Sequence, residues 1–223
     1  MKVPSRFSVE RARRMQASLA ERVVYERIKP RYVAGADVAY TERASIGAVS
    51  VLDYKTLATV EVKTAVTKIF FPYVPTLLSL REIPPLVKAA NAIGRKPDVY
   101  FVDGHGMLHP YRCGLATHFG VVLNVASIGV AKNRLVGEVG SFDQRDWAPV
   151  RIGDRVLGAA LRVPGRDKLM FISVGNKVIL RQAISIVRHC NLGYIMPEPI
   201  RVAHVEANKV RERILRRAGD DQT

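Results

Sequence analysis

Apolar residues recur along this chain with two different periods, which separate its expected helices from its expected strands. After Ser8, a residue type that caps helices, they recur every three or four positions and predict a helix over 8–28 that ends before Pro30. β-Branched and aromatic residues then dominate 32–40, 46–52 and 57–66, which predict three strands. Because the connections between them are short, these strands can pair only antiparallel.

The rest of the chain predicts strands and helices in mixed order. Closely spaced prolines make 70–75 a stiff loop, and Pro84-Pro85 predict the start of a helix that ends near Gly94. Further expected elements are a strand over 99–102, a helix over 114–123, strands over 126–130, 156–161 and 170–174, and helices over 178–189 and 201–217. Three antiparallel strands followed by βα units indicate a mixed α/β sheet with helices on its faces. The sequence shows no repeat and no convincing linker, which favours a single domain over residues 1–223.

Two carboxylates interrupt apolar strands, where a charge is costly to bury. Asp103 ends the strand over 99–102 and precedes Gly104-His105-Gly106, and Asp37 lies in the middle of the first strand. A buried charge must be paired or bind a metal, although Asp-Gly is also a common turn pair. If the two strands are parallel neighbours, Asp37 and Asp103 meet at one edge of the sheet. Oxygen ligands placed in this way suit Mg²⁺.

The composition predicts an electrostatic partner. The chain has 35 Lys and Arg residues against 20 Asp and Glu residues, a formal net charge of +15. This balance favours a polyanion, most simply a nucleic acid, over an anionic membrane surface or the absence of any such partner. No apolar run suits a signal peptide or a transmembrane helix, and two cysteines are too few for a disulfide framework, so a cytoplasmic location is expected. Cys190 is expected to fill the core.

Several short motifs, in order over roughly residues 30–210, resemble the endonuclease V family of repair nucleases for deaminated bases. They are Gly35-Ala36-Asp37, Pro72-Tyr73-Val74-Pro75 with Arg81-Glu82, Asp103-Gly104-His105-Gly106 with His109-Pro110, Gly114-Leu115-Ala116-Thr117-His118, Ile128-Gly129-Val130-Ala131-Lys132, and Pro197-Glu198-Pro199 with Arg201-Val202-Ala203-His204. Thr76 departs from the usual glycine, and Asn176 ends a Ser-Val-Gly-Asn run where Ser-Pro-Gly-His is typical. The resemblance and the strand pattern both indicate a ribonuclease H-like fold, with helices on both faces of its sheet.

The resemblance implies that Asp37, Glu82 and Asp103 form an acidic metal site, with Mg²⁺ as the cofactor and Mn²⁺ as its substitute. It also implies that Lys132 lies near the scissile phosphate and that His204 lies near a second metal ion. These five residues are the expected catalytic group and include the expected metal ligands. From the residues alone, Glu82 could instead form a surface ion pair with the preceding arginine, Lys132 could be a solvated lysine at a strand end, and His204 could lie on a helix surface.

A second set of residues is implied to bind the DNA around the lesion. Tyr73, which follows Pro72, matches the family's wedge residue, placed where the damaged base leaves the helix. Gly104-His105-Gly106 borders the expected lesion pocket, and His109 is expected close to the acidic cluster. Flanking prolines hold Tyr73 in an extended loop that suits a rigid wedge, although a tyrosine there could simply belong to the core. His109, before a proline, could likewise be a turn residue.

The implied activity is the nicking of one DNA strand at the second phosphodiester bond on the 3′ side of deoxyinosine or another deaminated base. The products would have 3′-hydroxyl and 5′-phosphate ends, and the base would not be excised. A mismatched base costs less to extrude from the duplex, which explains the selectivity. The alternatives are an endonuclease of the same mechanism acting on inosine in RNA, and a non-catalytic domain that binds nucleic acid. A monomer with no membrane partner is expected.

Overall fold

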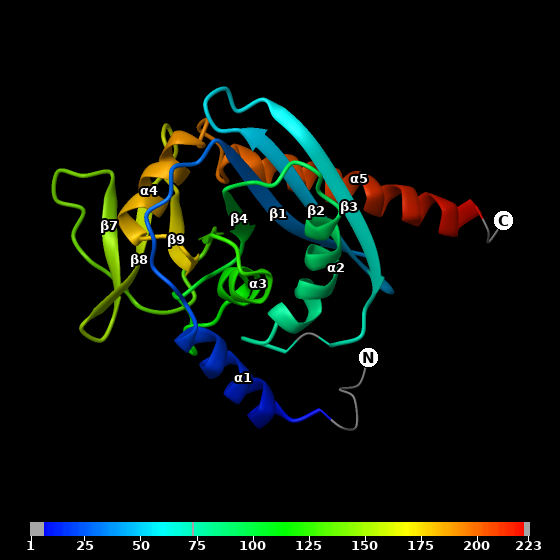
Figure 1. Cartoon of the computed structure of the whole chain (residues 1–223), viewed down its shortest axis with the longest axis horizontal. Helices are drawn as coiled ribbons and strands as arrows, with labels where there is room; N and C mark the ends of the chain where they lie inside the picture. The colour runs from blue at the N-terminus through cyan, green and yellow to red at the C-terminus, as the bar shows by residue number, and fades with distance from the viewer. Residues whose placement is uncertain (1–6, 73, 221–223) are drawn as a thin grey trace.

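The computed structural model describes residues 7–72 and 74–220, in which nine strands form one mixed sheet ordered β3-β2-β1-β4-β5-β9-β8-β7-β6 (Figure 1). The strands are β1 (Tyr32–Tyr40), β2 (Ala44–Asp53), β3 (Thr59–Lys68), β4 (Val99–Asp103), β5 (Ser127–Ala131), β6 (Glu138–Val139), β7 (Trp147–Ile152), β8 (Arg155–Arg162) and β9 (Leu169–Asn176). The helices are α1 (Val9–Glu21), α2 (Ser79–Asn91), α3 (Leu115–Leu123), α4 (Leu180–His189) and α5 (Glu198–Asp220).

The first five strands have the arrangement of a ribonuclease H-like sheet, as the sequence predicts. β2 pairs antiparallel with β1 and with β3. β4 lies parallel to β1 on its other side, and β5 continues the sheet parallel to β4. In this register Ala36 is opposite Val102, so Asp37 and Asp103 follow at the same edge of the sheet. We call this edge, at which β1, β4 and β5 end, the acidic edge.

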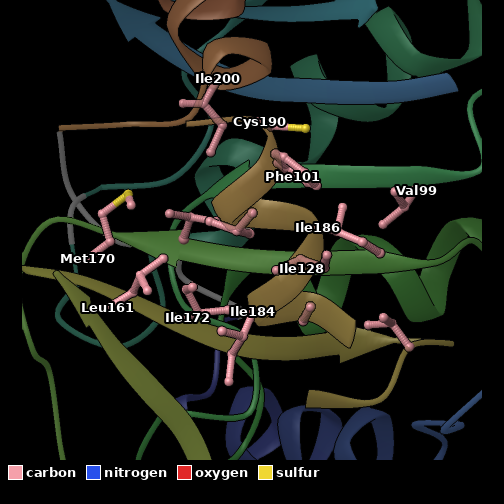
Figure 2. Packing of buried hydrophobic residues seen from close by; sticks show 14 of the residues in the cluster. Val99, Phe101, Ile128, Leu161, Met170, Ile172, Ile184, Ile186, Cys190 and Ile200 are labelled. Atoms are coloured by element: carbon pink, nitrogen blue, oxygen red, sulfur yellow. The ribbon is translucent and has the colours of Figure 1, made fainter. Parts of the chain in front are cut away.

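Helices cover both faces of the sheet because side chains alternate across every strand. On one face, Leu86 of α2 and Phe119 of α3 belong to the apolar cluster of the central strands. On the other face, the strands pack against α4 and the start of α5. Figure 2 shows this second core, in which Phe101 and Ile128 from the strands lie near Ile186 of α4. The sheet therefore holds the acidic edge between two pairs of helices.

The start of α5 lies directly against β1 because Gly35 has no side chain. A Cβ atom at Gly35 would lie 2.0 Å from the carbonyl oxygen of Pro199, which is closer than any real contact. The hydroxyl group of Ser50 on β2 donates to the same carbonyl oxygen over 2.7 Å. This close approach fixes where α5 begins and brings His204 to Asp37.

The helix predicted over 8–28 is too long. α1 begins as expected after Ser8, which caps it, but it ends at Glu21. The residues that follow form neither helix nor strand up to residue 30, and the backbone of Ile28 exchanges two hydrogen bonds, of 2.9 and 2.7 Å, with the side chain of Gln182 on α4. These tertiary hydrogen bonds satisfy the backbone in place of helical ones, and the local apolar period does not reveal them.

The second predicted helix begins too late. α2 starts at Ser79, so both Pro84 and Pro85 lie inside it. A proline in a helix interior removes a backbone hydrogen bond, but Leu86 and Ala89 on the next turn are fully buried. Their packing against the sheet outweighs the lost bonds. As a result, Glu82 lies in the first turn of a helix rather than in a loop.

The outer half of the sheet contains two strands that the sequence does not predict. β7 contains a proline at position 149, and β6 is only two residues long, so neither has a clear strand pattern. β9, β8 and β7 continue the sheet beyond β5 with antiparallel pairing. The other predicted elements are confirmed, with ends that shift by a few residues. Within the described residues, no helix combines the length and the apolar character needed to cross a membrane.

Candidate functional site

Three acids from separate elements converge at the acidic edge. Asp37 lies on β1, Asp103 is the last residue of β4, and Glu82 lies in the first turn of α2. Asp37 is 9% exposed and Glu82 is 8% exposed, and the side chain of Asp103 is 19% exposed. The charge of Asp37 acts on both of the other acids. The structure thus brings together the three acids that the sequence singles out.

Burial and mutual repulsion raise the pKa values of two of these acids. Burial, followed by the negative charge of Asp37, raises the pKa of Asp103 from its ordinary value of 3.8 to about 6. Burial also raises the pKa of Glu82 from 4.5 to about 8, although the hydroxyl group of Tyr40 donates a hydrogen bond of 2.7 Å to its Oε1. Buried carboxylates that resist ionisation in this way are typical of functional sites.

Two basic side chains contact the acids from the solvent side. Lys132, the first residue after β5, donates from Nζ to Oδ2 of Asp103 over 3.3 Å. His204 on α5 contacts Oδ2 of Asp37 through Nδ1 over 2.7 Å. Because a carboxylate can only accept, Nδ1 must hold the proton, so a neutral His204 has its lone pair at Nε2, where the amide of Asn208 lies 3.2 Å away. Both predicted basic residues therefore belong to this cluster.

The donor atoms at this edge fit a hard divalent cation. Over residues 7–72 and 74–220, no three His, Cys, Asp or Glu side chains are grouped closely enough to enclose a metal ion. Mg²⁺ does not need such an enclosure, because it is commonly held by one or two carboxylates and keeps several water molecules. Asp37 and Asp103 are two carboxylates on adjacent parallel strands. Burial and the negative charge of Asp37 raise the pKa values of Asp103 and Glu82, and a bound cation would offset both penalties.

Within the Gly104-His105-Gly106 turn, Gly104 and His105 form part of one wall of a pocket beside Asp103. A Cβ atom at position 106 would lie 2.1 Å from the carbonyl oxygen of Val174, so only glycine lets this turn pack against β9. The Nε2 atom of His105 lies 3.0 Å from the carbonyl oxygen of Asn133, and its buried Nδ1 has no hydrogen-bond partner in the described part of the chain. Burial lowers the pKa of His109, on the same wall, to about 4, so its ring is neutral near pH 7.

The loop that precedes α2 lies next to this wall. Tyr73, the predicted wedge, lies outside the described residues, whereas Pro72 is half-buried. Thr76 has a φ of +65°, a conformation that favours the glycine usual in the family. Its carbonyl oxygen accepts hydrogen bonds of 3.3 Å from Arg13 and 2.8 Å from Gln16, both on α1. α1 therefore fixes this loop in a glycine-like conformation despite the substitution.

Two pockets, each of about 240 Å³, share Asp103 as a lining residue. The first, here called the loop pocket, is lined by residues that include Thr76, Ser79, Glu82, His105, His109 and Leu115. The second, here called the α5 pocket, is lined by residues that include Lys132, Arg166, Tyr194, Ile195, Met196 and His204. A chain-like molecule that crosses Asp103 could therefore occupy both pockets at once.

Three residues of this region, Tyr40, Arg166 and Tyr194, are not among those that the sequence identifies. Tyr40 bonds to Glu82, and the guanidinium group of Arg81 lies 4.1 Å from the centre of the Tyr40 ring. The ion pair between Glu82 and the preceding arginine, the alternative from the sequence, is not formed. Tyr40 ends the strand that contains Asp37, and this position is the sequence feature that could have indicated its place near the acids. Arg166 and Tyr194 reach the α5 pocket from two distant connections, and no local pattern marks them.

Comparisons with known proteins agree with this geometry. Residues 14–205 match the family model described as Endonuclease V. The endonuclease V of Thermofilum pendens is 42% identical over 210 residues, which cover 92% of this chain and 90% of that protein. The crystal structure of the Streptomyces avermitilis enzyme superposes with a TM-score of 0.87 at 35% identity, covering 96% of this chain and 98% of that one. Endonuclease V of Ciona intestinalis, in complex with a 24mer DNA containing an inosine followed by a ribo-adenosine, gives a TM-score of 0.84 at 27% identity, covering 92% and 98%.

Proposed function

This chain belongs to the endonuclease V family, and from that premise we propose that it is a metal-dependent nuclease that nicks a nucleic-acid strand beside inosine. The main support is the convergence of two buried acids, Asp37 and Glu82, and the partly buried Asp103 with Lys132 and His204 at one edge of the sheet. A domain that only binds nucleic acid has no use for buried acids whose pKa values are raised. The net charge of this chain, +15, supplies non-specific attraction to the phosphate backbone of a nucleic acid.

The acidic edge is suited to Mg²⁺, with Mn²⁺ as a substitute. Asp37 and Asp103 would hold the ion, with Glu82 and His204 completing its surroundings. When bound, the ion would neutralise charge on the phosphate and make water more acidic. Lys132 adds a fixed positive charge beside Asp103, where the phosphate becomes more negative during cleavage. The hydrogen bond to Asp37 holds the His204 ring in one orientation.

The proposed substrate is DNA with a deaminated base, and the proposed cut is at the second phosphodiester bond on the 3′ side of deoxyinosine. Cleavage there would leave 3′-hydroxyl and 5′-phosphate ends. We assign the extruded base to the loop pocket, because His105 offers a buried ring nitrogen without a partner among the described residues and His109 is neutral. Such a wall suits an uncharged base with polar edges. The DNA bound to the Ciona relative contains an inosine, which supports the proposed substrate.

Inosine in RNA is a second candidate substrate. In the complex of the Ciona relative, a ribo-adenosine follows the inosine. That relative therefore binds a strand with a 2′-hydroxyl group beside the lesion, the feature that distinguishes RNA from DNA. The acidic edge would act identically on both strands.

A strand-nicking assay tests the proposal. Duplexes with one deoxyinosine, and matched duplexes without it, are incubated with Mg²⁺ or with a chelator, and an inosine-containing RNA strand is tested in parallel. We expect nicking only with metal and only at the second bond beyond inosine. Asp103→Asn should abolish nicking while DNA binding persists, and Asp154→Asn, an exposed acid at a β-turn, should behave as wild type. Nicking by Asp103→Asn at a near-normal rate would refute the proposed site.

A further inference from the structure

The α5 pocket is formed by two connections that meet at the acidic edge. The turn between β8 and β9 contributes Arg166, and the connection between α4 and α5 contributes Tyr194 and Ile195. β9 runs antiparallel to β5, with Ala131 opposite Phe171. The turn before β9 therefore lies beside the end of β5, next to Lys132. In this way the fold gathers side chains from distant parts of the chain around Asp103.

The connection between α4 and α5 exposes apolar side chains beside the charged groups of Asp103, Lys132 and Arg166. Leu192, Tyr194 and Ile195 are 57%, 47% and 37% exposed, while Met196 and Ile200 beneath them are buried. A cluster of exposed apolar residues beside a functional centre indicates a binding surface. An aromatic ring on an apolar floor suits a nucleobase, because bases stack on aromatic side chains without regard to their identity.

Two arginines border the same surface, and they differ in their partners. Arg201 is held by both carboxylate oxygens of Glu198, and its guanidinium group lies 5.1 Å from the centre of the Tyr194 ring. Arg166 donates from Nε to the carbonyl oxygen of Gly193 over 2.8 Å, and it forms no ion pair within the described residues. Arg166 is thus a positioned cation that no carboxylate neutralises. This is the chemistry of a phosphate contact.

We propose that the α5 pocket binds the second nucleotide on the 3′ side of the lesion, with its base against Tyr194 and its backbone phosphate at Arg166. This inference rests on the proposed function, in which the bond between the first and second nucleotides after the lesion is cut. Asp103 lines both pockets. A strand with its lesion in the loop pocket and its second following nucleotide in the α5 pocket therefore passes the bond to be cut across the acids. Occupation of both pockets fixes the distance between lesion and cut.

A pair of inosine duplexes that differ only at this nucleotide tests the inference. In one duplex the second nucleotide is normal, and in the other an abasic residue replaces it and keeps the phosphate. In single-turnover nicking, we expect the wild type to lose about 5-fold to 150-fold on the abasic duplex, the factor that base–aromatic stacking supplies. Tyr194→Ala should show that loss on the normal duplex and no further loss on the abasic one. Tyr194→Phe, which keeps the ring, should respond as wild type.

Arg166 has a separate signature and a matched set of controls. Arg166→Ala should slow nicking of both duplexes equally and should reduce the slope of log affinity against log salt by about 1, because one phosphate contact is lost. Tyr25→Ala and Arg155→Ala should match the wild type. Tyr25 is 54% exposed in the segment after α1, and Arg155 begins β8 at the opposite edge of the sheet. Thermal unfolding of every variant establishes that each is folded.

If the wild type nicks the inosine strand, two results would overturn the inference. One is an equal abasic penalty in the wild type and Tyr194→Ala. The other is a loss of inosine preference in Tyr194→Ala, which would place the lesion itself in the α5 pocket. A wild type that does not nick the inosine strand would instead refute the proposed function and this inference with it, so the two failures are distinguishable.

Discussion

At one edge of the sheet the buried amide of Asn176 has a partner for each of its polar atoms, whereas at the acidic edge the buried carboxylates repel one another. Oδ1 of Asn176 accepts from the backbone N–H of Val24 over 3.0 Å. Its Nδ2 donates to the carbonyl oxygens of Gly120 and Val125 over 3.0 and 3.2 Å. At the acidic edge, burial raises the pKa of Asp103, and the charge of Asp37 raises it further.

This difference separates polar groups that stabilise the fold from polar groups that the fold merely tolerates. The hydrogen-bonded amide of Asn176 joins three segments of the chain, and its removal would lower the stability of the fold. Buried acids that repel one another lower stability as long as they are charged. Their presence in apolar strands is therefore explained by function, and substitutions in the two regions should have opposite effects on stability and on activity.

The largest expected effect is that of Asp37→Asn on nicking. The substitution removes a carboxylate from the proposed metal site but keeps an oxygen that can accept from His204. We expect the rate of inosine-strand nicking to fall by at least about 10³-fold, the upper range for loss of one electrostatic contact to a reacting group. The thermal unfolding midpoint should not fall, because the charge that raises the pKa of Asp103 is gone. Single-turnover nicking with Mg²⁺ and thermal unfolding with a chelator measure the two effects, because a bound ion would itself stabilise the wild type.

The comparison would fail if Asp37→Asn lowered stability as much as activity. That result would mean that Asp37 contributes to the fold in the way that Asn176 does. Asp154→Asn, an exposed acid without a side-chain hydrogen bond in the described chain, provides the reference for both measurements.

Glu82→Gln should reveal the cost of the acids through the pH dependence of stability. Folding raises the pKa of Glu82 from 4.5 to about 8, so the wild type loses stability as the pH rises from about 4.5 to about 8. A glutamine still accepts from Tyr40 and has no such loss. Without metal, the free energy of unfolding of the variant should therefore rise relative to that of the wild type across this pH range, by on the order of a few kcal/mol at pH 8. Urea unfolding at pH 5, 6, 7 and 8 with a chelator would measure the gain, and parallel curves for both proteins would contradict it.

Asn176→Ala should show the opposite pattern. Removing the amide leaves the N–H of Val24 and the carbonyl oxygens of Gly120 and Val125 without this partner. We expect a loss of about 2–3 kcal/mol in the free energy of unfolding, because buried polar groups lose their hydrogen bonds. Nicking per folded molecule should stay within about twofold of the wild type, because none of the groups that Asn176 contacts belongs to the acidic edge and the activation free energy of the reaction should not change. Asn91→Ala, at the exposed end of α2, is the control, and a large loss of nicking in Asn176→Ala would connect the two regions.

The sequence predicts the acidic edge better than the region around Asn176, for a physical reason. Asp37 and Asp103 interrupt apolar strands, and an isolated charge in such a strand is a local signal. The parallel pairing of β1 and β4, which the sequence leaves as a condition, is what brings the two acids together. The partners of Asn176 lie up to 152 residues away, and no local pattern reveals them. The same long-range bonding around the segment after α1 explains why the first helix was predicted too long.

Other errors have similar origins. The start of α2 depends on the packing of Leu86, which outweighs the helix-breaking tendency of Pro84-Pro85. The α5 pocket depends on two connections whose meeting is set by the antiparallel outer half of the sheet, and β7 in that half was not predicted at all. Local composition can identify single strands and charges, but not which connections meet at an edge.

The smallest expected effect comes from charges that are neither buried nor satisfied. Arg213, Arg216 and Arg217 are exposed on the far half of α5. Arg213 follows His204 by nine residues, which at about 100° per residue places it on the opposite side of the helix. Arg216 is about 18 Å from His204 along the helix axis. Salt at 0.1 M screens interactions between exposed charges that lie more than about 10 Å apart. Changing all three to glutamine should therefore flatten the salt dependence of binding to undamaged duplex by a slope of at most about 3. Inosine preference should be unchanged in a competition assay, because these arginines lie far from both pockets. A loss of preference would show that the far half of α5 contacts the lesion, and the division between an acidic edge that selects and a surface that only attracts would then be wrong.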